Sequence, residues 1–183
     1  VKVKRKEFDS LSEKSKVFGC QPSLNVYDNV QSQIKVNPKK YLKRSGGGHL
    51  HFGVNGENNS IKNTLSDYKR LVPIFDMILG NTCVLLDRDK NNIERRKNYG
   101  RAGEFRIKPY GIEYRTLSNF WLRDYKLMSF VTGMGRYAIH LVNQSVDGND
   151  FVKVLNETLP REKVIQAIQE NNFDLAYENF SKI

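Results

Sequence analysis

The chain has 183 residues, enough for one sizeable hydrophobic core and little room for two. Its 39% hydrophobic and 27% charged residues are typical of a globular domain and exclude collagen-like, mucin-like and disordered classes. No apolar run is long enough to cross a bilayer, so the sequence excludes a membrane span. Thirty Lys and Arg against 20 Asp and Glu give a net charge of +10, which favours anionic partners such as nucleic acid, nucleotides, phosphates or carboxylates.

Two cysteines, Cys20 and Cys83, lack the spacing of a metal or disulfide motif, and we expect reduced thiols in a cytoplasmic protein. The sequence starts at Val1 and opens with a basic stretch that no apolar segment follows, so no signal peptide is indicated. We expect a natural N-terminus upstream of this residue.

Residues 1–44 are predicted to form a basic, irregular lead-in. Residues 45–56, SGGGHLHFGVNG, alternate between glycine clusters and predict a short strand. On such a strand His49 and His51 share one face, while Leu50 lies on the other.

A helix is predicted from Ser60, because apolar residues then recur at three- and four-residue steps up to Leu79. Pro73 predicts a kink or a junction of two helices, and Gly80 is the expected end. The charged stretch 87–101 has no apolar periodicity and predicts a loop.

Two alternating runs, Gly103–Lys108 and Ile112–Thr116, flank a Pro-Tyr-Gly turn and predict an antiparallel hairpin. Thr116 or Ser118 is expected to cap a following helix. The expected core anchors of this helix are Phe120, Trp121, Met128 and Val131. The tail from Asp150 is predicted to be helical. The expected fold is one α+β domain, with the lead-in at 1–44, a sheet and helix core at 45–145 and a helical tail at 146–183.

The segment GGGHLHFG holds two of the three histidines beside three glycines. Imidazole binds divalent metals and phosphate oxygens, and glycines let a ligand approach the backbone. The alternative is a glycine-rich turn entering a strand whose histidines are polar surface.

The predicted hairpin places Glu104 and Arg106 on one face of the first strand, and Glu113 and Arg115 on one face of the second. Guanidinium groups bind phosphate and carboxylate in bidentate fashion, so this face suits a site that holds a metal and an anion. A cross-strand ladder of salt bridges explains the same pattern equally well, and the sequence leaves both interpretations open.

Four segments resemble, in order, the phage-type carboxylate–amine (COOH–NH2) ligase family of the glutamine synthetase and glutamate–cysteine ligase superfamily: FGCQPSLNVY, RSGGGHLHFG, RLVPIFDMILGNTCVLLD and RRKNYGRAGEFRIKPYGIEYRTLSNFWL. The resemblance covers residues 17–122. Its most specific part runs from Arg95 to Leu122.

The resemblance implies a curved antiparallel sheet with packed helices, a glutamine-synthetase-like catalytic domain. It also implies ATP-dependent amide-bond formation through an acyl phosphate, with Mg²⁺ or Mn²⁺ and with a carboxylate and an amine as substrates. The residues that it implies for the site are His49 and Glu113 for the metal, Arg106 and Arg115 for catalysis, and Gly47, Gly48, His51, Arg96 and Arg101 for the nucleotide.

Superfamily members carry paired acidic metal ligands on an earlier strand, and residues 1–44 contain no such pattern. The resemblance therefore predicts a domain incomplete at its N-terminus, which a missing segment or another chain completes, with an oligomer as a further option. If the chain is encoded by a phage, it would act in the host cytoplasm. The alternative function is a non-catalytic basic phage scaffold or nucleic-acid-binding protein with a ligase-like fold, motivated by the charge of +10.

Overall fold

The structure is a computed structural model that describes residues 2–17, 22–28, 36–54, 56, 59–145 and 151–183. The predicted thiol at Cys20 lies outside these residues, whereas Cys83 is buried and free. The elements in chain order are α1 (Arg5–Asp9), α2 (Glu13–Lys16), β1 (Leu24–Asn25), β2 (Leu50–Gly53), α3 (Leu65–Phe75), the π-helical segment η1 (Asp76–Gly80), α4 (Asn81–Leu86), α5 (Asn91–Arg96), β3 (Glu104–Lys108), β4 (Gly111–Tyr114), the 3₁₀ turn η2 (Phe120–Arg123), α6 (Tyr125–Gln144), α7 (Phe151–Thr158), α8 (Arg161–Gln169) and α9 (Phe173–Phe180).

In the described part of the chain the strands form one antiparallel sheet in the order β1-β3-β4-β2. The predicted α+β class with an antiparallel sheet and packed helices is therefore confirmed. The hairpin of β3 and β4 is confirmed as well, and its register places Arg106 opposite Glu113. On the other side of β4, strand β2 places His51 opposite the same glutamate.

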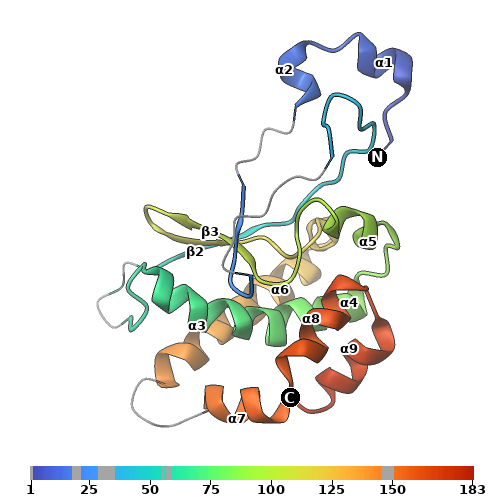
Figure 1. Ribbon diagram of the computed structural model, residues 1–183. Coiled ribbons are helices and arrows are strands. Elements are labelled where there is room, and N and C mark those ends of the chain that lie inside the picture. The colour runs from blue at the N-terminus through green and yellow to red at the C-terminus, as the bar shows by residue number, and fades with distance from the viewer. Residues whose placement is uncertain (1, 18–21, 29–35, 55, 57–58, 146–150) are drawn as a thin grey trace.

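The two faces of this sheet differ in character. Leu50, Phe105, Ile112 and Tyr114 are at most 4% exposed and belong to the hydrophobic core. Helix α3 contacts β3 and β4 on this side, and Figure 1 shows α3, α6 and α8 below the sheet, with α1 and α2 above it. Because side chains alternate along a strand, the charged residues of the hairpin occupy the opposite face.

A continuous helical stretch follows from α3 through η1 to α4, and it corrects the predicted end at Gly80. Thr64 caps α3 by accepting a hydrogen bond from the Asp67 backbone N–H at 3.2 Å. The sequence predicted a kink or a helix junction at Pro73, which has no N–H to donate. The wide π-helical turn begins three residues later, at Asp76.

Gly80 does not end the helix but allows close packing. Its φ and ψ of −59° and −50° are helical. A Cβ at this position would lie 2.7 Å from Tyr114 Oη and 2.9 Å from Ile168 Cδ1. Gly80 therefore lies where the helical stretch packs closely against both the sheet and α8.

The prediction of a loop at residues 87–101 is wrong for Asn91–Arg96, which form helix α5. This helix buries Asn92, Arg95 and Arg96. Their i, i+3, i+4 spacing is that of one helix face, but the face is polar, so a search for apolar periodicity does not find it.

The segment after the hairpin also differs from the single helix that was predicted. Its first part is the 3₁₀ turn η2, and α6 starts after Asp124, whose side chain accepts from the Lys126 N–H at 2.7 Å. Phe120, Trp121 and Val131 are buried as predicted. The prediction for Met128 is wrong, since this residue is 41% exposed.

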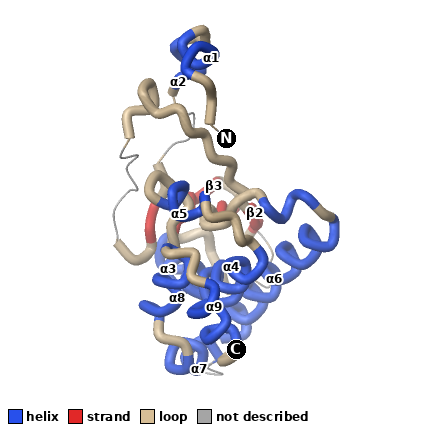
Figure 2. Tube along the Cα trace, turned by 90° about the vertical axis from the view of Figure 1, so that its right-hand side faces the viewer, coloured by secondary structure: helices blue, strands red, loops and turns tan. Residues whose placement is uncertain are grey.

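The N-terminal part of the chain is more regular than predicted. The C-terminal part is helical, as predicted. The irregular lead-in holds α1, α2 and β1, and β1 is a two-residue strand that depends on its pairing with β3. Figure 2 shows α1 and α2 at one end of the molecule, with α7 and α9 at the other. In the chain as described, no helix combines the length and apolar character that a membrane span requires.

Candidate functional site

Glu113 is the centre of a charged cluster on the open face of the sheet. Because Arg106 lies directly opposite on β3, its guanidinium reaches both carboxylate oxygens, with Nε 2.8 Å from Oε2 and Nη2 2.5 Å from Oε1. Lys108 Nζ lies 3.0 Å from Oε2, and Arg115 Nε lies 3.4 Å from Oε1. The Glu113 side chain is only 1% exposed, so this carboxylate is held almost entirely by its neighbours.

His49 completes the cluster from the residue before β2. Its Nδ1 lies 2.9 Å from Glu113 Oε1, which confirms that the predicted histidine and glutamate come together. Burial, followed by the charge of Arg115, lowers the His49 pKa to about 4 against the opposing effect of Glu113. The neutral ring therefore donates from Nδ1 to Glu113, and the buried Nε2 has no partner among the described residues.

The cluster carries an excess of positive charge. Burial alone would raise the Glu113 pKa, but hydrogen bonds from Arg106 and Lys108 outweigh it and lower the pKa to about 2. Three cations, Arg106, Lys108 and Arg115, thus face one carboxylate and one neutral imidazole, leaving a formal charge of +2. The salt-bridge ladder, one of the two interpretations that the sequence left open, is therefore present around Glu113.

Gly47 and Gly48, predicted to contact a nucleotide, lie against other residues of the chain, and this packing leaves no room for a side chain at either position. A Cβ at Gly47 would lie 2.3 Å from His49 Nε2. One at Gly48 would lie 2.2 Å from the Ser118 carbonyl oxygen and 2.3 Å from Trp121 Nε1. The glycines therefore make room for the imidazole and the indole, and a role in nucleotide binding stays a prediction.

His51 lies on the same face but at its rim. It is exposed, and its Nδ1 lies 2.5 Å from Tyr110 Oη with the two rings stacked at 6.1 Å. The structure thus brings His51 beside the cluster without a contact to Glu113 other than the strand pairing.

The other two predicted arginines point elsewhere. Arg96 Nη1 donates to Asn171 Oδ1 at 3.0 Å, in the joint between α8 and α9, and burial lowers its pKa to about 10. Arg101 pairs with Glu104 at 3.1 Å and with Asp28 at 3.4 Å, towards the β1 edge of the sheet. Their proposed nucleotide contacts stay predictions.

Tyr99 and Lys108 belong to the site but were not predicted. The Tyr99 ring lies 5.9 Å from Arg115 Cζ and 6.2 Å from the His49 ring, and its hydroxyl donates to the Ser45 carbonyl oxygen at 2.9 Å. Lys108 follows Arg106 by two residues on β3, so the strand alternation already contained its signal. In the sequence, Tyr99 could be recognised only as an aromatic residue within an arginine-rich stretch.

The described residues do not by themselves fit a divalent metal site. Within the ranges that the structure describes, no three His, Cys, Asp or Glu side chains are grouped closely enough to hold an ion. Magnesium requires several oxygen ligands, whereas both Glu113 oxygens here accept hydrogen bonds from cations. His49 and Glu113 form a pair that further donors would have to complete.

Comparison with known families gives a match over residues 28–153 to the phage phiEco32-like COOH.NH2 ligase-type 2 family. The match contains the hairpin, the glycine-rich segment and α3 to α6. No curated protein and no solved structure is significantly similar to the chain.

Proposed function

We propose that this chain, which belongs to the phage phiEco32-like COOH.NH2 ligase-type 2 family, is the ATP-binding part of a carboxylate–amine ligase. Membership supports ligation of a carboxylate to an amine in general. The finer proposal is that ATP drives it through an acyl phosphate on a glutamine-synthetase-like domain. The observation that carries it is the Glu113-centred cluster, whose formal charge of +2 suits the binding of a carboxylate or phosphate group.

In the proposed reaction, a carboxylate oxygen of the substrate attacks the γ-phosphorus of ATP, and ADP leaves. The amine nitrogen then attacks the acyl carbon, and the bond to phosphate breaks as the amide forms. The nitrogen loses its proton, so the products are the amide, ADP and phosphate. No covalent intermediate with the protein is needed.

Arg106 and Arg115 are assigned to charge stabilisation during phosphoryl transfer. Guanidinium groups fixed before the reaction stabilise the negative charge of a transferring phosphoryl group without reorganising. Glu113 fixes the two guanidiniums through its ion pairs, and its low pKa keeps it ionised at neutral pH. His51 at the rim is assigned to the nucleotide, together with Gly47 and Gly48.

Mg²⁺ or Mn²⁺ is the metal class that ATP chemistry implies, but no step is assigned to it because the described residues supply only His49 and Glu113. The carboxylate and the amine are proposed partners of unknown identity. A cytoplasmic location and completion of the site by a further segment or chain are part of the same proposal.

The test is ATP-dependent trapping of an acyl phosphate by hydroxylamine, which gives a hydroxamate. The full-length protein is incubated with ATP, Mg²⁺ and a panel of amino acids and other carboxylates. We expect hydroxamate and ADP with at least one carboxylate, and a roughly hundredfold lower rate for Arg106→Gln.

The matched control is Arg136→Gln, which removes an exposed arginine from α6 on the other side of the sheet. It should leave the rate unchanged. Hydroxamate formation that is equally fast in Arg106→Gln, or the absence of ADP with every carboxylate of the panel, would contradict the proposal.

A further inference from the structure

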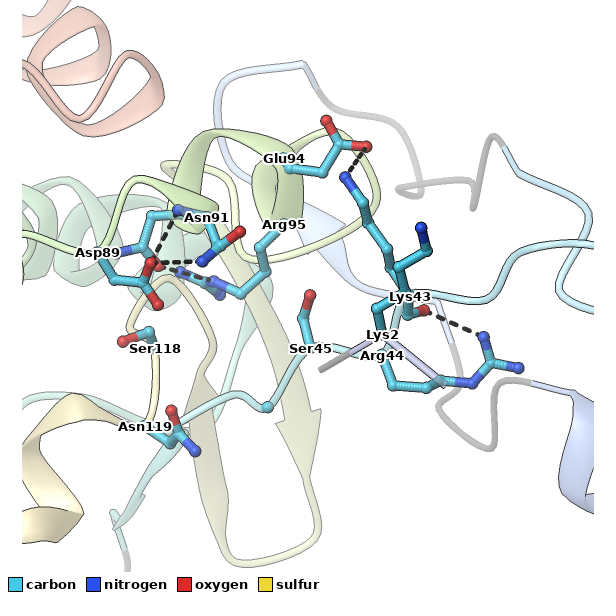
Figure 3. Close-up of a pocket in the computed structure, with 12 residues that line it drawn as sticks. Lys2, Lys43, Arg44, Ser45, Asp89, Asn91, Glu94, Arg95, Ser118 and Asn119 are labelled. Carbon is cyan, nitrogen blue, oxygen red and sulfur yellow. Dashed lines mark hydrogen bonds and ion pairs between the residues drawn. The ribbon is translucent and has the colours of Figure 1, made fainter. Parts of the chain in front are cut away.

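A second cationic site is formed where the N-terminal segment meets α5. A pocket of about 430 Å³ lies between the segment containing Lys2 and residues 43–46 on one side and residues 89–95 with Ser118 and Asn119 on the other. Figure 3 shows Lys2 and Lys43 on one wall and Asp89, Asn91 and Arg95 on the opposite wall. This volume is within the range of small-molecule sites.

Two lysines are held side by side at this pocket. The main chains of Lys2 and Lys43 form an antiparallel bridge, supported by the hydrogen bond from Val3 N to the Leu42 carbonyl oxygen at 3.0 Å. Like charges directly opposite each other on paired strands repel and destabilise the pair. An anion bound between them would remove that repulsion.

The opposite wall contains a buried cation. Arg95 is 3% exposed, and it donates to Asn92 Oδ1 at 3.3 Å and to the Thr116 carbonyl oxygen at 2.7 Å. Both acceptors are neutral, and Nη1 has no hydrogen-bond partner in the described ranges. Burial lowers the Arg95 pKa more than Tyr99, Asp87 and Glu104 raise it. Since low dielectric surroundings screen a charge poorly, its positive potential extends into the pocket.

The remaining charges do not cancel this excess. Lys2, Lys43 and Arg95 oppose the two lining carboxylates, Asp89 and Glu94, which gives a formal charge of +1. Of these carboxylates, Glu94 is shared between Lys43 at 3.9 Å and Lys97 at 3.0 Å. Arg44 also lines the pocket, but its guanidinium donates to the carbonyl oxygens of Lys16 and Pro38. None of the described lining residues is aromatic, so the pocket offers no ring on which a nucleobase could stack.

We propose that this pocket is a binding site for a small oxyanion, a carboxylate or a phosphate group, separate from the Glu113 cluster. The Tyr99 ring stands between the two sites, because it lies 5.4 Å from Arg95 Cζ and 5.9 Å from Arg115 Cζ. The inference goes beyond the proposed ligase function and does not depend on it.

The experiment is calorimetric titration of the full-length protein with phosphate and with malonate at constant ionic strength. We expect at least one of them to bind, and the tighter one identifies the group that the pocket prefers. The double variant Lys2→Gln/Lys43→Gln should bind about tenfold more weakly. Asp89→Asn should bind about threefold more tightly, because it removes a lining negative charge.

The matched control is Lys69→Gln/Lys153→Gln, which removes the same charge from exposed positions on α3 and α7. It should bind like the wild type. Equal weakening in the control, wild-type affinity in Lys2→Gln/Lys43→Gln, or no binding of either anion by the wild type would overturn the proposal. The hydroxamate assay is separate, so failure of the ligase function would not be mistaken for failure of this site.

Discussion

Burial lowers the pKa of one ionisable residue, His49, and raises the pKa of another, Asp76. The His49 pKa is lowered from 6.5 to about 4, chiefly by burial. Burial raises the Asp76 pKa from 3.8 to about 6, although Tyr114 and Tyr27 donate to its carboxylate at 2.6 and 2.8 Å. Both residues are therefore mainly uncharged in the folded protein between pH 4.5 and 5.5, and Asp76 is about half ionised at pH 6.

These two pKa changes make opposite contributions to the pH dependence of stability between pH 4.5 and 6. The unfolded chain binds one proton more at His49 and one fewer at Asp76, so the two slopes have opposite signs. In Asp76→Asn only the His49 slope remains, and the free energy of unfolding should fall by roughly 2 kcal/mol on acidification across this range. In His49→Gln it should rise by a similar amount.

Urea unfolding at several pH values measures both slopes. His140→Gln is the control, since this histidine is exposed on α6, and its profile should follow that of the wild type. Parallel profiles for Asp76→Asn and His49→Gln would refute the assignment.

The residues of the cluster could be predicted where one strand pairing decides the contact. Arg106 faces Glu113 because a two-residue turn fixes the hairpin register, and both residues are close in the sequence. Asp76 could not be predicted in this way. Its partner Tyr27 lies 49 residues earlier, and only the packed fold brings the two together.

At the level of elements, two helical glycines should respond oppositely to alanine. Gly80→Ala places a Cβ 2.7 Å from Tyr114 Oη, so we expect a net loss of about 1–3 kcal/mol despite the better helix propensity of alanine. Gly133→Ala in α6 meets no atom within 4 Å and should stabilise the protein by about 1 kcal/mol. Thermal and urea unfolding of the two variants give both values, and the same sign for both would contradict this account.

Periodicity predicted the elements whose buried residues are apolar and failed where they are polar. The hairpin follows from the alternation of its residues, and the tail is helical as predicted. Helix α5 buries arginines and an asparagine, and the two-residue strand β1 is too short to leave a pattern. Both depend on partners that are distant in the sequence.

For the whole molecule, the tail is part of the core although it lies beyond the family match. Residues 154–183 follow the matched range, yet α8 and α9 pack on η1 and α4. Asn81 connects them, since its Nδ2 donates to the Ala176 carbonyl oxygen at 2.9 Å and its Oδ1 accepts from Asn179 Nδ2 at 3.0 Å. All three residues are fully buried.

Asn81→Ala should therefore lower the free energy of unfolding by about 2–3 kcal/mol, because it leaves buried polar groups without partners. The control Asn91→Ala removes an asparagine that is exposed on α5 and should cost much less. Unfolding followed by circular dichroism and by Trp121 fluorescence should give coincident transitions for both proteins. An early separate transition in the wild type would show that the tail is not integral to the core.

The wide turn Asp76–Gly80 also fixes the length of the chain at this point. A π-helical turn accommodates more residues than the α-helical turns on either side of it, so deleting one residue here is compatible with an unbroken α-helix. Such a deletion would rotate everything before it by about 100° relative to α4. Asp76 would then turn away from the hydroxyls of Tyr27 and Tyr114, and the apolar stripe of α3 would leave the sheet. Homologous chains that keep this carboxylate are thus expected to tolerate no single-residue gap between Pro73 and Asn81.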